Sequence, residues 1–430
     1  MAVKISPLTI KSYTMRRYLM AGGPLRVARA LSTTAVSPTN ALDLISPTLG
    51  LSEDQVTIYE LARSFADKEM RPHAAMWDEK SHFPLETYKK FGELGFAGIF
   101  VEEDVGGSAM SRVDTTVIVE ALATGCVGTT AMLTIHNMCA GMIDKFGNAK
   151  QRQRFLPKMC DLSLKASYCL TEPGSGSDAG SLSTKAVFDP KTNEYVLNGN
   201  KAFISGAGMS DIYLVMCRTG GGGPGGISCV IVPKDATGLS FGANEKKMGW
   251  KCQPTRQVIL EDVRVSAENF LGTEGQGFKM AMAGLDGGRL SIGACSLGAA
   301  QASFELALAY AKERKQFNRA ISNNQAMQFK FADMAGKILS SRLALRHAAA
   351  LLDAGDPAAT MQCALAKKIA TDYGAEVCND ALQIHGGYGY LSDYHVERYV
   401  RDVRVHQILE GTNEIMRFIV GRALTSSSLV

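Results

Sequence analysis

Acidic residues are missing from the start of the chain, since no Asp or Glu precedes Asp43. The same stretch is rich in Ser and Thr, and its basic residues are Lys4, Lys11, Arg16, Arg17, Arg26 and Arg29. A basic, hydroxyl-rich, acid-poor leader without a long apolar core is typical of a mitochondrial transit peptide rather than a secretory signal. We therefore predict a leader over residues 1–42 and leave it out of the fold prediction. The alternative reading is a disordered basic tail.

Other absences exclude whole classes of protein. No uninterrupted apolar run of about 18 residues occurs, so we predict no membrane span. The ten cysteines form no CxxC pair, which favours reduced core thiols in a compartment such as the mitochondrial matrix. The seven histidines form no HExxH motif and no His–Cys cluster, so we expect no metal site. The net charge of +4 owes much to the leader, and no basic patch is interleaved with aromatics. We therefore expect no nucleic-acid partner.

Local patterns divide the rest of the chain into three regions. Residues 50–164 are helical in pattern, beginning with a capping box at Ser52 and Gln55. Residues 165–274 contain short β-rich runs between turn signals, and the tract Gly220–Gly226 is predicted to be a loop between two strands. Residues 275–430 contain one proline, Pro357, and helical periodicity throughout. The predicted fold class is mainly α with a central β domain, ending in a four-helix bundle.

Two buried helix faces are predicted in the last region from apolar residues at helical spacing. One face consists of Met327, Phe331, Met334, Ile338 and Leu345, and the other of Leu365, Ile369 and Tyr373.

The segment from Tyr168, YCLTEPGSGSDAGS, is built to approach a ligand. Pro173, Gly174 and Gly176 prevent a regular strand or helix and bring the backbone close to whatever lies beside it. The alternative is a generic polar turn. Further on, Phe203 and Ser205 place an aromatic ring and a hydroxyl at the end of a predicted strand, although Phe203 alone would fit a core equally well. Neither segment is a Rossmann fingerprint.

Glu410 ends an amphipathic run, Arg404–Glu410, and is followed at once by Gly411. A carboxylate placed where a helix breaks can reach into a cleft as a general base. It can also be a solvated helix end, with Gly411 after the last turn and Thr412 capping the next helix.

Six motifs in order carry a family resemblance: YCLTEPGSGSDAGS, the FIS triplet at Phe203–Ser205, LDGGRLSIGACSLG, RKQF, LQIHGGYGYL and RVHQILEGTNEIMR. Together they resemble the acyl-CoA dehydrogenase family from about Leu51 to the C-terminus. The resemblance implies an α–β–α architecture whose middle domain is a β-barrel or sandwich, and FAD as cofactor. The stretches EALATGC, IHNMCA, ISGAG and GWKCQPTR most resemble members that oxidise isobutyryl-CoA to methacrylyl-CoA in valine breakdown.

The resemblance also implies site residues. Glu410 matches the catalytic carboxylate. Flavin contacts are implied for Tyr168, Cys169, Leu170, Thr171, Glu172, Pro173, Gly174, Ser175, Gly176, Ser177, Phe203, Ile204, Ser205, Thr412, Asn413 and Glu414. Contacts to the adenine side of FAD, some donated by a neighbouring subunit, are implied for Arg314, Asn324, Gln325, Gln383, Ile384, His385, Gly386 and Gly387. Substrate contacts are implied for Ser177, Asp286, Gly287, Gly288, Arg289 and Arg422.

In the mechanism that the resemblance implies, Glu410 takes the α-proton while the β-hydrogen leaves as hydride to flavin N5. The backbone N–H of Glu410 and a ribityl hydroxyl of the flavin bind the thioester oxygen as charge develops on it. The resemblance further implies a homotetramer that passes electrons to electron-transfer flavoprotein. Two residues depart from patterns in the family: Phe203 stands where many relatives have Trp, and Gly288 stands where one branch carries its base.

Three alternatives stay open. The substrate could be 2-methylbutyryl-CoA or a short straight-chain acyl-CoA, because one methylene in an apolar pocket changes binding by only about 1–3 kcal/mol. A dehydrogenase-like assembly factor could keep the fold without turnover, although Glu410, Ser205 and Arg289 are all present. A peroxisomal oxidase with the same chemistry is disfavoured, because the chain does not end in SKL.

Overall fold

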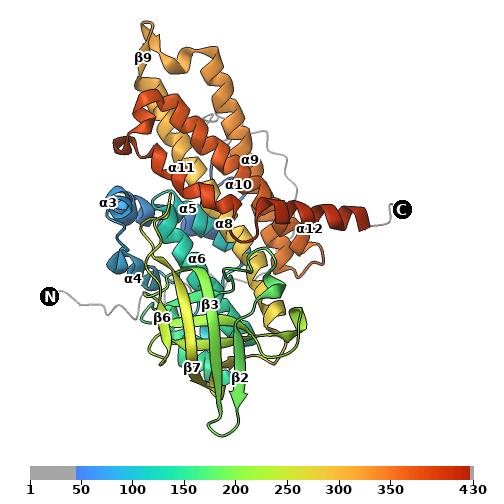
Figure 1. Cartoon of the computed structure of the whole chain (residues 1–430). Coiled ribbons are helices and arrows are strands. Elements are labelled where there is room, and N and C mark those ends of the chain that lie inside the picture. Colours follow the sequence, from blue (N-terminus) through green and yellow to red (C-terminus); the bar gives the residue numbers. More distant parts are fainter. Residues whose placement is uncertain (1–44, 427–430) are drawn as a thin grey trace, which may run out of the picture. The chain divides into compact units, whose positions relative to one another are not determined.

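The computed structural model describes residues 45–426. The predicted leader at residues 1–42 lies outside this range. Helices come first, then an eight-stranded sheet, then long helices (Figure 1). This order confirms the predicted fold class of helical regions on both sides of a β domain.

The first region is helical because its segments begin at well-formed caps. The predicted capping box at Ser52 and Gln55 is confirmed, since Ser52 Oγ accepts from the Gln55 N–H and the Gln55 side chain accepts from the Ser52 N–H. Similar boxes start two later helices, at Ser111 and at Asn148. The α-helices of this region are α2 (Glu53–Phe65), α3 (Ala74–Glu79), α4 (Leu85–Glu93), α5 (Arg112–Ala123), α6 (Val127–Phe146) and α7 (Ala149–Cys160).

The middle region forms a sheet with strand order β6-β7-β3-β2-β4-β5-β8, and β1 pairs in parallel with β4. The glycine-rich tract Gly220–Gly226 connects β4 to the antiparallel β5, as predicted. The strands are β1 (Ala166–Cys169), β2 (Lys185–Asp189), β3 (Glu194–Ser205), β4 (Ile212–Arg218), β5 (Ile227–Pro233), β6 (Leu239–Phe241), β7 (Thr255–Ser266) and β8 (Phe270–Leu271).

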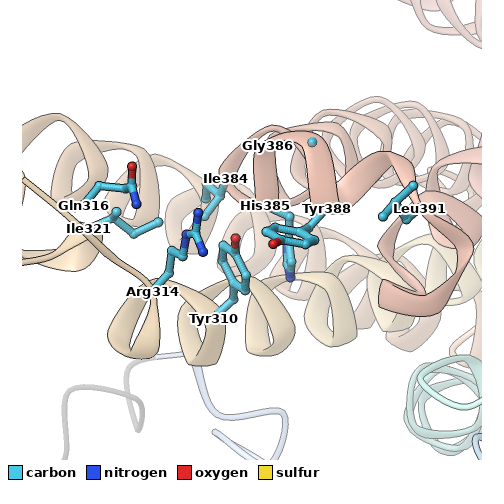
Figure 2. A pocket seen from close by; sticks show the side chains of 10 residues that line it. Tyr310, Arg314, Gln316, Ile321, Ile384, His385, Gly386, Tyr388 and Leu391 are labelled. Atoms are coloured by element: carbon cyan, nitrogen blue, oxygen red, sulfur yellow. The ribbon is translucent and has the colours of Figure 1, made fainter.

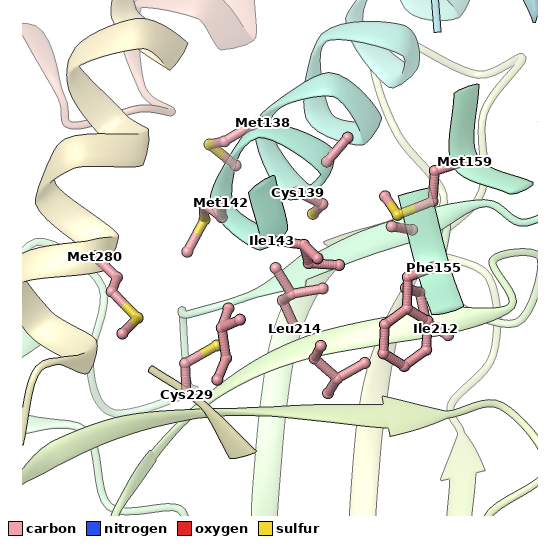
Figure 3. Close-up of a cluster of buried hydrophobic side chains, with 14 of the residues drawn as sticks. Met138, Cys139, Met142, Ile143, Phe155, Met159, Ile212, Leu214, Cys229 and Met280 are labelled. Atoms are coloured by element: carbon pink, nitrogen blue, oxygen red, sulfur yellow. The ribbon is translucent and has the colours of Figure 1, made fainter. Parts of the chain in front are cut away.

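Strand β4 is buried on both of its faces, which explains its continuous apolar sequence. Alternate residues Ile212, Leu214 and Met216 pack against α6, α7 and α8, where methionines fill much of the core (Figure 3). The residues between them, such as Tyr213 and Val215, pack with side chains of β3 and β7. The sheet therefore folds over itself and presents one outer face to the helices.

The last region contains three long helices that pack on one another: α8 (Gly277–Glu313), α9 (Gln325–Asp353) and α10 (Ala359–His385). The short hairpin of β9 (Lys315–Gln316) and β10 (Arg319–Ala320) joins α8 to α9. The chain then continues through α11 (Val396–Arg404) to α12 (Asn413–Ser426), and both contact α10.

The predicted buried face of α9 is correct, because Met334, Ile338 and Leu345 are buried and Met327 and Phe331 pack beside them. The predicted face of α10 is wrong. Leu365 is 37% exposed, whereas the buried face is made of the small residues Cys363, Ala366, Ala370 and Gly374 together with Lys367. Small residues allow α10 to approach α8 closely, since a Cβ at Gly374 would come within 2.9 Å of Ser296 Cβ.

Helix α8 is long and apolar enough to cross a membrane by length and composition alone, with a window of mean hydropathy 1.3. In the fold, 78% of that window is buried inside the protein, as in a core helix.

Candidate active site

Glu410 lies in an irregular connection and not at the end of an α-helix. Helix α11 ends at Arg404, a single 3₁₀ turn follows, and Glu410 then takes a left-handed backbone with φ of +57°. The predicted helical run through Glu410 is therefore wrong. Gly411 continues the left-handed turn with φ of +89°, and α12 begins at Asn413. A left-handed Glu costs about 1–2 kcal/mol, so the surrounding structure must hold this turn in place.

The carboxyl group of Glu410 is turned towards α8. A Cβ atom at Gly288 would overlap Oε2 of Glu410 and lie 2.9 Å from its Cδ. The residue as a whole is partly exposed, but Oε2 is buried without a hydrogen-bond partner. Burial raises the pKa of Glu410 to about 7, against the opposing charges of Arg289 and Lys367. A carboxyl with this pKa is suited to take up a proton near neutral pH.

The backbone N–H of Glu410 makes no hydrogen bond with any residue in the range 45–426. It is therefore available to a bound molecule, as an oxyanion donor requires.

Residues 286–289 of α8 form a buried polar cluster beside this carboxylate. Arg289 Nη1 donates to Asp286 Oδ1 at 2.6 Å, and Thr360 Oγ1 donates to Asp286 Oδ2 at 2.7 Å. A Cβ at Gly287 would overlap the guanidinium of Arg112, which lies 3.6 Å from the centre of the Phe100 ring. Arg112 was not predicted as a site residue, because an arginine at the first position of α5 carries no signal of a distant tertiary contact.

On the sheet side, Phe203 and Ser205 stand at an irregularity near the end of β3. The pairing of β3 with β7 shifts register between Lys201 and Ile204, and Phe203 there has φ of +58° and is 70% exposed. Ser205 Oγ accepts a hydrogen bond from Gln253 Nε2 at 3.2 Å, and its carbonyl accepts from Ser167 Oγ at 2.6 Å. Gln253 was also missed in the sequence. Ile204 points into the core of the sheet.

The loop after β1 is fastened from within by Glu172. Its carboxylate accepts from Lys201 Nζ at 2.8 Å and from the backbone N–H groups of Ser183 and Thr184. The side chain therefore points into the β domain. By contrast, a Cβ at Gly174 or Gly176 would meet nothing within 4 Å. The outer edge of the loop is open for a ligand to approach.

The other residues of this loop likewise lie either inside the β domain or on its open outer edge. Cys169 and Leu170 are buried, Ser175 Oγ bonds the Asp178 carbonyl, and Pro173 and Ser177 are exposed. The Thr171 carbonyl accepts from the Ala202 N–H at 2.9 Å, which joins the loop to β3.

Tyr168, where the loop begins, lies near enough to Glu410 for the two groups to interact electrostatically. Its hydroxyl is buried without a hydrogen-bond partner. Burial, with the Glu410 charge next in importance, holds the pKa of this phenol well above its usual value. The structure thus brings together Glu410, the α8 cluster and the end of β1, and the Ser167–Ser205 bond adds the end of β3.

A second set of predicted residues lies at the other end of α8 (Figure 2). Arg314, Ile384, His385, Gly386 and Gly387 line a pocket of about 490 Å³. In it, the rings of Tyr310 and His385 stack at 4.5 Å, and Arg314 lies 5.4 Å from the Tyr388 ring centre. Helix α8 ends at Glu313, and its 25 steps from Gly288 to that residue, at 1.5 Å each, separate this pocket from Glu410 by roughly 38 Å along the helix.

The remaining predicted residues lie near these two places or on α12. Asn324 accepts a hydrogen bond from Arg319 at 2.6 Å, while Gln325 and Gln383 are exposed close to the pocket. Thr412 Oγ1 accepts from the Ile415 N–H, so it caps α12, which is the role it has in the alternative reading of this segment. Glu414 pairs with Arg417 at the surface. Arg422 is exposed on α12, and no described contact brings it to Glu410.

Comparison with known proteins identifies the class. Three family models match successive parts of the chain: the acyl-CoA dehydrogenase N-terminal domain over residues 52–163, the middle domain over 167–263 and the C-terminal domain over 275–425. The chain belongs to the acyl-CoA dehydrogenase family, whose members are FAD-dependent flavoproteins. It is an oxidoreductase that carries out FAD-dependent dehydrogenation of an acyl-CoA.

Individual members of the family are similar to this chain over most of its length. Mitochondrial isobutyryl-CoA dehydrogenase of Bos taurus is 53% identical, over 94% of this chain and 99% of the relative. The protein of the same name from Dictyostelium discoideum is 55% identical, over 88% and 91%. The structure of butyryl-CoA dehydrogenase from Megasphaera elsdenii superimposes with a TM-score of 0.84 at 36% identity, covering 87% of this chain and 99% of that one. The two mitochondrial relatives indicate a mitochondrial location.

The residues present fit a flavin. An exposed aromatic ring on a left-handed residue, open space beside Gly174 and Gly176, and the unpartnered hydroxyl of Tyr168 lie on connected elements. A planar cofactor covering Phe203 would bury this apolar surface and exclude water from the neighbouring carboxylate.

Proposed function

We propose that this chain converts isobutyryl-CoA to methacrylyl-CoA in valine breakdown, with Glu410 as the base that removes the α-proton. The substrate rests on the identity of 53% and 55% to two isobutyryl-CoA dehydrogenases. The role of Glu410 rests on one observation, a carboxyl oxygen that is buried without a partner and has a pKa raised to about 7 by burial.

The proton transfer needs a base that is ionised before substrate binds and becomes protonated afterwards. Near pH 7 to 8, Glu410 is substantially ionised because its pKa is about 7. A thioester α-hydrogen is weakly acidic, so negative charge on the carbonyl oxygen must be stabilised as the proton leaves. The free N–H of Glu410 provides one donor for this oxygen, placed on the same residue as the base.

FAD, when bound, supplies the acceptor for the β-hydride. We assign its binding to the loop Tyr168–Ser177 and to Phe203–Ser205 on the sheet side, and to Thr412–Glu414 at the start of α12. The bond from Gln253 to Ser205 Oγ fixes that hydroxyl at the edge of the proposed site. Asp286–Arg289 and Ser177 are assigned to the acyl-CoA, as is Arg422, whose exposed position on α12 requires a long CoA moiety or a second subunit to reach it.

We further propose a homotetramer in the mitochondrial matrix that donates electrons to electron-transfer flavoprotein. The pocket at Arg314 and His385 lies too far along α8 to belong to the site of the same chain, so we assign it to FAD held by a neighbouring copy. Large apolar side chains that lie exposed on the last region support such contacts: Phe317, Phe329, Leu343, Tyr390, Phe418 and Leu424.

A panel of C4 and C5 acyl-CoAs, assayed with an artificial electron acceptor, tests the substrate. We expect kcat/KM for isobutyryl-CoA to exceed that for 2-methylbutyryl-CoA and for butyryl-CoA. 2-Methylbutyryl-CoA has one methylene more than isobutyryl-CoA, a difference worth about 1–3 kcal/mol in an apolar pocket and thus a preference of about 10–200-fold. Butyryl-CoA is the unbranched isomer of isobutyryl-CoA, so the preference over it depends on the shape of the pocket.

A higher kcat/KM for one of the other two thioesters would move the assignment to that substrate. Absence of turnover with every member of the panel, in protein that carries FAD, would contradict the proposed function.

A further inference from the structure

Lys367 is a lysine in an unusual environment. It lies in the middle of α10, and its side chain is 0% exposed. Lysines normally extend their ammonium group to water, and a buried one needs a specific reason. Among residues 45–426, no carboxylate lies within ion-pair distance of its Nζ. The ammonium is therefore buried against neutral partners.

Those neutral partners belong to the turn that carries Glu410. Lys367 Nζ donates to the carbonyl of Gly411 and to Oδ1 of Asn413, both at 2.8 Å. Asn413 Nδ2 in turn donates to Thr371 Oγ1 at 2.9 Å and to Asp372 Oδ1 at 2.6 Å. These bonds attach Gly411 and Asn413, the first and third residues after Glu410, to one face of α10. They explain how a left-handed Glu410 is held against its conformational cost.

The two hydrogen bonds do not by themselves require a charge, since a neutral amide also has two N–H donors. Burial lowers the pKa of Lys367 to about 8, and Glu410 is the acid that opposes this most strongly. Reciprocally, Arg289 first and then Lys367 oppose the rise in the pKa of Glu410. The two groups therefore act on each other through a poorly hydrated region.

Other titratable and charged groups also face the pair formed by Lys367 and Glu410, but the hydrogen bond to the Gly411 carbonyl comes from Lys367. From α8, Arg289 pairs with Asp286 at 2.6 Å and opposes the rise in the pKa of Glu410 more strongly than Lys367 does. His406, next to α11, is neutral because burial lowers its pKa to about 3. The remaining groups are Tyr168 on β1 and Cys139 on α6, both with a pKa well above the usual value, and the acids Asp372 on α10 and Glu414 on α12.

We propose that Lys367 is the positioning residue of the base: its hydrogen bonds hold the Glu410–Gly411 turn, and its charge keeps the Glu410 carboxyl ionised before substrate binds. This inference rests on the proposed role of Glu410. It predicts two separable effects, one on geometry and one on ionisation.

The test is the pH profile of kcat/KM from pH 5.5 to 9, measured on FAD-loaded protein with the best thioester of the panel. Lys367→Met removes both charge and donors, Lys367→Gln keeps an amide donor without charge, and Lys367→Arg keeps the charge. We expect the acid limb to move up by about one pH unit in the Met and Gln variants. It should stay in place in the Arg variant, whose rate falls at every pH because the geometry differs.

Lys368→Met is the matched control, because Lys368 neighbours Lys367 and pairs with Asp372 at 3.3 Å without touching Gly411. Its acid limb should coincide with that of the wild type. If the Met variant does not fold, the Gln and Arg variants decide the question.

An acid limb that stays at the wild-type pH in the neutral variants, whether or not their rates fall, overturns the inference. Glu410→Gln separates this failure from failure of the proposed function. If that variant is inactive while the limb does not move, only the role of Lys367 is wrong. If it retains wild-type rate, the base itself is misassigned.

Discussion

At the scale of single residues, the site depends on a glycine that leaves room for a carboxylate. Gly288 lies inside α8, where glycine is less favourable than alanine by roughly 0.5–1 kcal/mol. The fold accepts that cost because the Glu410 carboxyl occupies the volume that a Cβ would need. A side chain at position 288 of α8 and the carboxylate of Glu410 therefore cannot occupy their places at the same time.

Gly288→Ala should displace the Glu410 carboxylate and lower kcat about 10²-fold, since a shift of about 1 Å in a reacting group costs this much. FAD content, measured from flavin absorbance, should stay the same. Gly421→Ala on α12 is the control, because its Cβ would meet nothing within 4 Å and its rate should be unchanged. A Gly288→Ala enzyme with wild-type kcat would show that the carboxylate works from another position.

At the scale of elements, the loop after β1 is held by a buried ion pair. Burial alone would raise the pKa of Glu172, but Lys201 and the donors of Ser183 and Thr184 lower it to about 2. Because the folded pKa lies below the unfolded value of about 4.5, this stabilisation is complete above pH 4.5. It is lost as pH falls towards 2.

Lys201→Met should cost about 3–5 kcal/mol in the free energy of unfolding at pH 7, because it leaves a buried carboxylate without its partner. Urea unfolding measures this, and the loss should shrink as the pH is lowered below 4.5. The control is Lys89→Met, which breaks an exposed pair with Glu86 and should cost about 1 kcal/mol or less. Equal losses in the two variants would contradict the structural role of the Glu172 pair.

At the scale of elements, some features could be predicted from the sequence and others could not. The capping box at Ser52 and the loop at Gly220–Gly226 were predictable because their signals are local. The buried face of α10 was not, because it consists of Cys, Ala and Gly whose burial depends on close approach to α8. The end of α11 at Arg404 was missed because no Gly or Pro marks it.

At the scale of the whole molecule, all ten cysteines are free and buried. They are spread over the helical and β regions alike, as expected of small core residues in a reducing compartment. Their thiols should therefore report on global opening and not on any one site.

In native FAD-loaded protein, we expect Ellman's reagent to modify less than about one thiol per chain within minutes, since buried thiols are inert. After unfolding in guanidinium, all ten should react. Rapid modification of several thiols in the native protein would contradict the observed burial.

Only part of the candidate site could be predicted from the sequence. Motif order pointed to Glu410, to the loop from Tyr168 and to Phe203–Ser205. Lys367, Gln253 and Arg112 had no local signal, because each acts through a residue more than 40 positions away or on another element.

The reductive half-reaction of Glu410→Gln tests the central claim most directly. FAD-loaded protein is mixed anaerobically with isobutyryl-CoA, and loss of flavin absorbance is followed. Glu86→Gln serves as control, because Glu86 is an exposed carboxylate on α4 that pairs with Lys89. We predict that Glu410→Gln binds the thioester yet bleaches its flavin about 10²–10⁴-fold more slowly, while Glu86→Gln bleaches at the wild-type rate. Bleaching of Glu410→Gln at close to the wild-type rate would contradict the assignment of Glu410 as the base.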